Sequence, residues 1–284
     1  MSTSHEFHYK VPRRSAGWRP GSHIGSSLGT GQEFVSHGRL YDRPDPRRLD
    51  LRASLREVRG DWLVRIHRQR VSVRVHVIVD VSASMRFGAP RSKLQVVADF
   101  VEALGYSAFR VGDPLGMVAF DHHVRDDLFV PALRNRGAGT FMAAALKGCE
   151  GSAGGIEGLE EAALRIGGRD GLVFLVSDFH WPLERLDDVL DRLAPAFVVP
   201  MVTWDPAETR PPPQDALLAV HDAESSARRT LWLRPSVRNR WLESVDNKRQ
   251  ELDRLFAARA IRTFHVCGEF DGDALSRYFF EIAA

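Results

Sequence analysis

The 284-residue chain contains only two cysteines, Cys149 and Cys267, and neither lies in a Cys-x-x-Cys pair or beside a histidine. The sequence therefore offers no disulfide framework and no cysteine-based zinc site, and we expect two reduced thiols. No apolar run reaches the roughly 18 residues that cross a bilayer. Residues 1–10 contain His5, Glu6 and His8 where a signal peptide has its apolar centre. We therefore expect a cytoplasmic chain without a membrane role.

Two further patterns are missing. The glycine-rich segment 21–31 has neither the Lys-Ser/Thr ending of a phosphate-binding loop nor the G-x-G-x-x-G spacing of a dinucleotide site. Residues 1–70 carry 14 Lys and Arg against 7 Asp and Glu, but the only adjacent basic pairs among them are Arg13-Arg14 and Arg47-Arg48. The remaining residues carry 25 basic against 30 acidic side chains. We expect this basic N-terminal extension to pack on the acidic remainder or to precede it flexibly, with nucleic-acid binding as the alternative.

What the sequence does contain is an apolar run that ends in oxygen donors. Residues 77–79 are Val-Ile-Val, which predicts a strand buried on both faces, and Asp80, Ser82 and Ser84 follow at its end. One carboxylate and two hydroxyls suit Mg²⁺ or a similar hard cation better than a soft metal. The D-x-S-x-S pattern is short, and simple turn-forming roles before a helix are an equal alternative for these side chains.

Two later positions complete a recognisable order. Thr140 ends a glycine-rich turn before a helical run, and Asp178 ends a second buried strand over 171–178. The set Asp80, Ser82, Ser84, Thr140 and Asp178 resembles the metal-ion-dependent adhesion site of von Willebrand factor A-like domains. The resemblance implies that these five residues hold Mg²⁺, or another hard divalent cation such as Mn²⁺ or Ca²⁺. It also implies a protein partner that supplies a further carboxylate to the ion.

The flanking segments narrow the resemblance. Residues 41–56, 85–93 and 112–116 are similar to the bacterial von Willebrand A-like family known as domain of unknown function number fifty-eight, and the match is best over 33–205. Soluble members of that family are commonly encoded beside MoxR-type AAA+ ATPases, and an MxaS-like branch accompanies methanol dehydrogenase maturation genes. The resemblance therefore implies an adaptor that helps such an ATPase act on a client, for example methanol dehydrogenase.

Strand and helix patterns alternate along the chain from residue 71. Strand patterns cover 71–80, 116–120, 124–130, 171–177, 197–204 and 261–266, and helical patterns cover 94–104, 140–149, 156–166, 183–193, 235–256 and 272–280. This order predicts an α/β fold with a doubly wound, mostly parallel sheet and helices on both faces. We expect this domain to span 71–284, with a Pro-rich connection and a small hairpin near 205–234. Pro200 predicts that its strand is short or peripheral.

The expected position of the two carboxylates follows from this fold. Ligands of doubly wound sheets bind beyond the carboxyl ends of the strands, where the strand order reverses. Asp80 and Asp178 both follow strands, and the resemblance to von Willebrand A-like domains implies that these strands are neighbours flanking that point. We expect His180 and Trp181 on the rim of the site, and residues 121–123, Asp-His-His, in a polar hairpin tip rather than a metal site.

An enzyme is the alternative to a binding module. A D-x-D phosphotransferase needs a second aspartate two residues after the first, where this chain has Ser82. The sequence also has no G-x-S-x-G nucleophile elbow. We therefore predict no catalytic residues, and metal-dependent protein binding rather than a Mg-dependent hydrolase.

Overall fold

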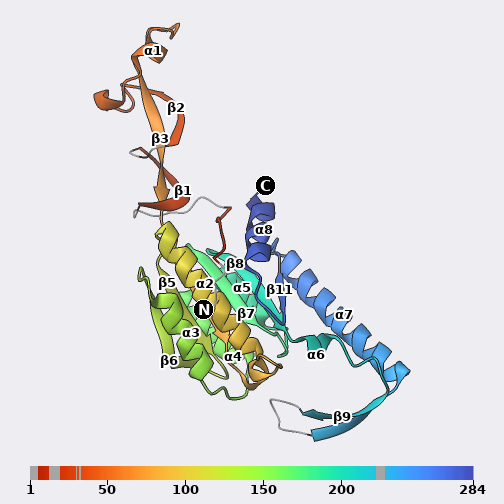
Figure 1. Ribbon diagram of the computed structural model, residues 1–284. Helices are drawn as coiled ribbons and strands as arrows, with labels where there is room; N and C mark the ends of the chain where they lie inside the picture. Colours follow the sequence, from red (N-terminus) through yellow and green to blue (C-terminus); the bar gives the residue numbers. More distant parts are fainter. Residues whose placement is uncertain (1–5, 13–19, 30, 32, 222–227, 284) are drawn as a thin grey trace. The chain divides into compact units, whose positions relative to one another are not determined.

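The computed structural model describes residues 6–12, 20–29, 31, 33–221 and 228–283 (Figure 1). The chain divides into two compact units, one of residues 1–10 with 74–284 and the other of residues 11–73. Each is described by itself. The division falls at Arg74, three residues after the expected boundary. The Arg13-Arg14 pair, on which the nucleic-acid alternative partly depends, lies outside the described residues.

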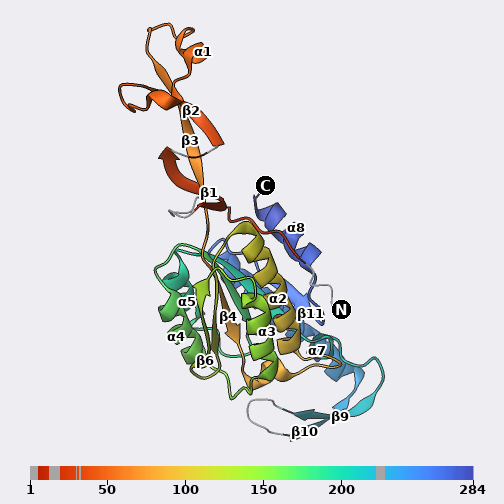
Figure 2. The same ribbon diagram turned by 60° about the vertical axis from the view of Figure 1, so that its left-hand side comes forward.

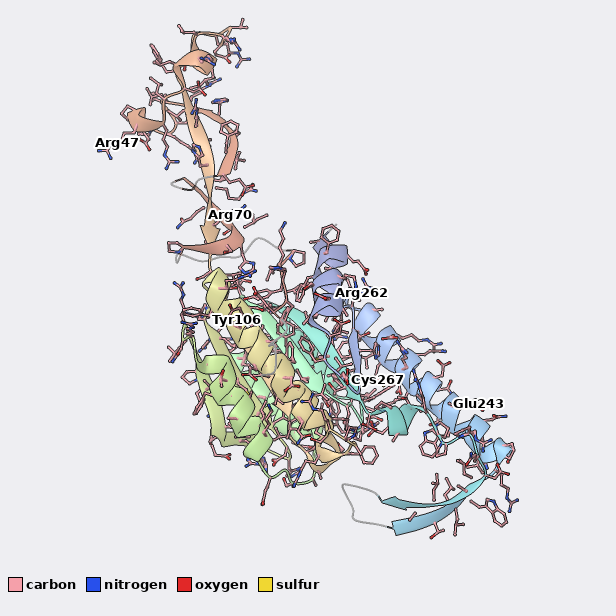
Figure 3. The ribbon with its side chains drawn as sticks, viewed as in Figure 1. Arg47, Arg70, Tyr106, Glu243, Arg262 and Cys267 are labelled. Carbon is pink, nitrogen blue, oxygen red and sulfur yellow. The ribbon has the colours of Figure 1, made fainter. Side chains whose placement is uncertain are left out.

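The smaller unit is built on a three-stranded antiparallel sheet in the order β1-β3-β2. Its elements are β1 (Pro20–Gly29), β2 (Glu33–Arg39), the 3-10 helix η1 (Pro46–Arg48), α1 (Leu51–Ser54) and β3 (Leu63–Val71). Asp50 caps α1 by accepting a hydrogen bond from the backbone of Ala53, and its other oxygen accepts Arg65 Nε at 2.8 Å. The hydrogen bond from Arg65 holds the pKa of Asp50 well below its usual range. Arg47 lies on the same unit (Figure 3).

The larger unit contains a six-stranded sheet in the order β11-β8-β7-β4-β5-β6. The strands are β4 (Val75–Asp80), β5 (Leu115–Phe120), β6 (Val124–Leu133), β7 (Leu172–Ser177), β8 (Phe197–Trp204) and β11 (Phe264–Cys267). All neighbouring pairs are parallel except β5 and β6, which are antiparallel. The doubly wound, mostly parallel α/β sheet expected from the sequence is therefore confirmed.

Helices cover both faces of this sheet (Figure 2). They are η2 (Ala83–Arg86), α2 (Lys93–Val111), α3 (Ala138–Gly148), α4 (Ile156–Ile166), α5 (Leu186–Leu193), α6 (Pro206–Thr209), α7 (Pro235–Ala257) and α8 (Gly272–Ala283). The apolar residues of α4 and α5 form one core cluster with inward-facing residues of β4, β5, β7 and β8. On the other face, Phe100 of α2 and Phe279 of α8 contact the ring of Phe174 in β7, with centroid distances of 5.1 and 6.1 Å.

The described part of the first ten residues belongs to this second core. Phe7 and Tyr9 are 1% and 7% exposed, because alternate side chains of the segment point into the unit. The ring of Phe7 stacks on Phe100 at 6.1 Å, and the Tyr9 hydroxyl donates to Asp113 at 2.7 Å. The basic extension predicted as a single segment, 1–70, is thus divided between the two units.

The strand that contains Pro200 differs from the expectation. β8 is eight residues long, lies between β11 and β7, and is almost wholly buried. A proline is accommodated because β11 pairs only with Met201 to Trp204, so at Pro200 the strand has a partner only in β7. Without a neighbour on that side, the missing backbone donor costs little.

Several local predictions are confirmed. Ser92 and Gln95 form a reciprocal capping box at the start of α2, and Pro235 is the first residue of α7. The hairpin before α7 consists of β9 (Ala216–His221) and β10 (Arg228–Leu233), which are antiparallel (Figure 1). Among the described residues, no helix combines the length and the apolar character that a bilayer crossing requires.

Candidate metal centre

Asp80 and Asp178 lie at the carboxyl ends of adjacent strands. Asp80 is the last residue of β4, Asp178 follows the last residue of β7, and these two strands pair in parallel. The chain places β5 and β6 on one side of this pair and β8 and β11 on the other, so the strand order reverses here. Both carboxyl groups are fully buried, at 0% exposure. The structure therefore brings them to the expected switch point.

Neutral donors surround the carboxyl group of Asp80. One oxygen accepts the backbone N–H of Ser82 at 2.9 Å, and the other accepts the hydroxyl of Ser177 at 2.7 Å and the indole N–H of Trp181 at 3.4 Å. Burial, followed by the negative charge of Asp178, raises the pKa of Asp80. Within the described part of the chain, the contacts of this carboxylate supply hydrogen bonds but no positive charge, which a bound cation would provide.

The two serines add oxygen ligands beside Asp80. Ser82 directly precedes η2 and Ser84 lies within it, and their hydroxyl oxygens are 3.1 Å apart. Both residues are buried. A carboxylate with two neighbouring hydroxyls is an oxygen-only donor set, and it fits a hard divalent cation. If an ion binds here, Asp80, Ser82 and Ser84 would hold it, with Asp178 close by.

A lysine neutralises the other carboxylate. Lys93, the first residue of α2, is 2% exposed. Its ammonium group donates to Asp178 Oδ2 at 2.6 Å and to Glu208 Oε1 at 2.6 Å. Burial lowers the pKa of Lys93, but the charges of the two carboxylates outweigh it and raise that pKa above its usual value. Sequence reasoning missed both Lys93 and Glu208.

Glu208 and His180 form the outer part of this cluster. Glu208 belongs to α6, where its side chain also accepts the backbone N–H of Asp205 in a capping box. Ligand atoms of Asp178, His180 and Glu208 lie within 4.8 Å of one another. Burial raises the pKa of Glu208, but hydrogen bonding to His180 and the charge of Lys93 bring it below its usual value. The Asp-x-x-Glu spacing of the capping box was the one sequence signal for Glu208.

Thr140 is not brought to this cluster. It lies in the first turn of α3 with an exposed side chain, and its hydroxyl donates to Glu102 of α2 at 3.4 Å. Helix α2 begins at the site with Lys93, so Glu102 is nine residues, or about 14 Å, along the helix. The expected fifth metal ligand is therefore at a distance from Asp80 and Asp178.

The antiparallel strand β6 explains the position of Thr140. Because β6 runs against β5, it carries the chain away from the carboxyl ends of the other strands, and α3 begins at the opposite end of the sheet.

The loop after α3 returns to the site instead. The backbone oxygen of Ser152 accepts the N–H of Ala83 at 2.9 Å, and a Cβ on Gly151 would lie 1.9 Å from the Val81 oxygen. The Gly151 position therefore requires glycine.

Three other expected positions can be compared with the structure. Residues 121–123 join β5 to β6, with Asp121 N donating to His123 O at 3.0 Å, so the hairpin tip is confirmed. Trp181 is 8% exposed and bonds to Asp80, so it forms part of the interior rather than the rim. His180 is partly exposed, as a rim residue should be, and its ring stacks on Trp204 at 6.4 Å.

Comparisons with known proteins place these observations in context. No curated protein matches the chain. An aerotolerance-related membrane protein from Bacteroides fragilis is 12% identical with a TM-score of 0.44, covering 74% of this chain and 98% of that one. The conserved hypothetical protein BatB from Bacteroides thetaiotaomicron is 13% identical with a TM-score of 0.44, covering 75% and 98%. Proximal thread matrix protein 1 from the mussel byssus, with a zinc-occupied MIDAS motif, is 17% identical with a TM-score of 0.36, covering 46% and 38%.

At such identities and TM-scores we draw no argument from the solved structures. The family comparison does not depend on them. A family model described as "Protein of unknown function DUF58" matches residues 39–251, which include Asp80, Ser82, Ser84, Lys93, Asp178 and Glu208. The chain therefore belongs to the DUF58 family.

Proposed function

We propose that this chain is a metal-ion-dependent protein-binding module rather than an enzyme. The observation that carries the proposal is the cluster of Asp80, Ser82 and Ser84 beside Asp178 at the switch point of the sheet. Asp80 and its two serines would hold a hard divalent cation such as Mg²⁺, Mn²⁺ or Ca²⁺. Lys93 already compensates part of the charge of Asp178, whereas the hydrogen bonds that Asp80 accepts from described residues come from neutral groups.

A partner carboxylate would complete the coordination. The two serines are neutral, and Thr140 does not reach the site, so the proposed ion keeps coordination positions for an outside ligand. A hard cation that has few charged ligands attracts a further carboxylate more strongly than one that is fully neutralised. An Asp or Glu side chain of a partner protein meets this requirement.

The partner assignment follows from the family resemblance. We propose an adaptor that works with a MoxR-type AAA+ ATPase on a client such as methanol dehydrogenase. With an ATPase as partner, the proposed place of action is the cytoplasm, where ATP is available. Nucleic-acid binding would instead need the basic residues of the N-terminal extension, and no described contact supports it.

An affinity pull-down from the native cell tests the proposal. The full chain is used as bait in Mg²⁺ and in EDTA, beside the variants Asp80→Ala and Asp126→Ala. Asp126 is an exposed residue of β6 that pairs with Arg165. Its replacement by alanine therefore removes one negative charge, as Asp80→Ala does, but at a position away from the site. We expect EDTA and Asp80→Ala to release the same partner and Asp126→Ala to retain it. The proposal is wrong if the folded Asp80→Ala variant keeps the strongest partner undiminished in EDTA.

A further inference from the structure

A cation of the chain itself lies inside the acidic cluster. The ammonium group of Lys93 is 2.6 Å from one oxygen of Asp178 and 2.6 Å from one oxygen of Glu208. The side chain of Lys93 is 1% exposed, so it has no route to solvent without a rearrangement of its surroundings. The ammonium group thus occupies the position between two carboxylates that a metal ion would otherwise favour.

The groups around the ammonium form a ligand set for a transition metal. His180 Nε2 lies 3.7 Å from Glu208 Oε1 and 4.0 Å from Asp178 Oδ2. One imidazole and two carboxylates at such spacing suit Zn²⁺ and related ions, which prefer mixed nitrogen and oxygen ligands. These donors differ from the oxygen-only set of Asp80, Ser82 and Ser84.

A buried hydroxyl at the same level provides an independent observation. Thr203 of β8 is 1% exposed, and its hydroxyl has no hydrogen-bond partner among the described residues. Ser177 pairs with Val202, and Asp178 and Thr203 are the residues that follow this pair along the two chain segments. A buried polar atom without a hydrogen-bond partner among the described residues therefore belongs to the strand next to the one that precedes Asp178.

We propose that Lys93 is a tethered cation that excludes transition metals from Asp178, His180 and Glu208, and so determines which ion the whole site accepts. This inference rests on the proposed function and extends it. Because Lys93 holds Asp178, the proposed hard cation binds at Asp80, Ser82 and Ser84. A second cation cannot share Asp178 Oδ2 with the ammonium group without strong repulsion. Removal of that group leaves three ligands preorganised around an empty position.

The test uses variants in which Asp80 is replaced by asparagine. Metal binding at Asp178, His180 and Glu208 is then measured separately from the ion proposed at Asp80. The variant Lys93→Met/Asp80→Asn loses one positive and one negative charge and keeps Asp178, His180 and Glu208. The control Lys147→Met/Asp80→Asn has the same net charge, and it removes a surface lysine that is 43% exposed and pairs with Asp99 at 3.4 Å. Titration calorimetry with ZnCl₂ measures affinity, and Co²⁺ absorption reports a nitrogen ligand.

We expect Lys93→Met/Asp80→Asn to bind one Zn²⁺ per chain at least about 10-fold more tightly than the control. Adding His180→Ala should abolish this gain and the Co²⁺ bands. Equal Zn²⁺ affinity in the two folded double variants would overturn the inference. If the lysine variant is unfolded without metal, recovery of its native circular dichroism on adding Zn²⁺, but not Mg²⁺, supports it, and failure to recover refutes it. Neither outcome depends on whether a partner binds through Asp80.

Discussion

Asp80 and Asp178 both lie at the carboxyl ends of adjacent strands, yet the protein compensates their charges differently. Both are fully buried. Asp80 receives hydrogen bonds from neutral groups, whereas Asp178 accepts a buried ammonium group at 2.6 Å. Burial and the neighbouring charge therefore raise the pKa of Asp80. The source of the compensating charge, rather than burial, therefore distinguishes a candidate ion ligand from a structural ion pair.

The largest effect is expected from removing the lysine. Lys93→Met leaves Asp178 and Glu208 without their buried partner, so we expect a loss of about 3–5 kcal/mol in the free energy of unfolding. Urea unfolding in EDTA, followed by tryptophan fluorescence, measures it. Lys147→Met, at the surface, should change stability by less than about 0.5 kcal/mol. A small loss for Lys93→Met would mean that the ion pair contributes little and that the two carboxylates are equivalent.

Replacing the two aspartates one at a time compares them directly. Without metal, Asp178→Asn should lower stability by about 2–4 kcal/mol, because Lys93 then keeps only Glu208 as its anionic partner. Asp80→Asn removes a buried charge that has no cationic contact with a described residue, so the stability of this variant should stay within about 1 kcal/mol of wild type or increase. Urea unfolding at pH 7.5 in EDTA gives both values. Equal losses in the two variants would contradict the distinction.

The opposite end of β4 predicts a pH effect that does not involve the site. Burial, with a smaller contribution from Arg169 and Arg74, lowers the pKa of His76 from 6.5 to about 4. Between these values the unfolded chain binds a proton that the folded chain does not, so this contribution is complete above pH 6.5 and is lost as the pH falls toward 4. We expect the loss to reach about 2–3 kcal/mol.

The measurement is the difference in unfolding free energy between wild type and His76→Gln, taken from pH 7.5 to pH 4. The difference should shrink steadily over that range. His122→Gln, in the exposed hairpin tip, is the matched control for replacing a histidine by glutamine. A difference that does not depend on pH would show that His76 is not buried in its neutral form.

The smallest effect is expected from the ion itself. With a dissociation constant on the order of 1 mM, about 10 mM Mg²⁺ would stabilise the folded chain by about 1.4 kcal/mol and raise the melting temperature by about 3–6 °C. The shift should vanish in Asp80→Ala and persist in Asp126→Ala. Thermal melting followed by circular dichroism measures this. Identical melting of wild type with Mg²⁺, Mn²⁺ or EDTA would remove the reason to treat Asp80 as an ion ligand.

The position of Thr140 shows which features of the site can be predicted from local sequence patterns. A hairpin at residues 121–123 was predicted from the sequence, and such a hairpin already reverses the direction of the following strand. That reversal implies that the next helix starts at the far end of the sheet, so the distance of Thr140 from the site could have been deduced. The glycine-rich turn before Thr140 predicts a helix start two residues after the observed one at Ala138, but it contains no information about which end of the sheet that start occupies.

Features that depend on neighbours along the chain follow from the amino-acid pattern alone. The buried runs that end at Asp80 and Asp178, the capping box at Ser92 and the alternation of strands and helices all follow from short-range patterns. Right-handed crossovers then place the two aspartates at the switch point. Tertiary structure alone decided which charges meet. Lys93 is 85 residues from Asp178 and 115 from Glu208, so their contacts arise only when α2, β7 and α6 pack together.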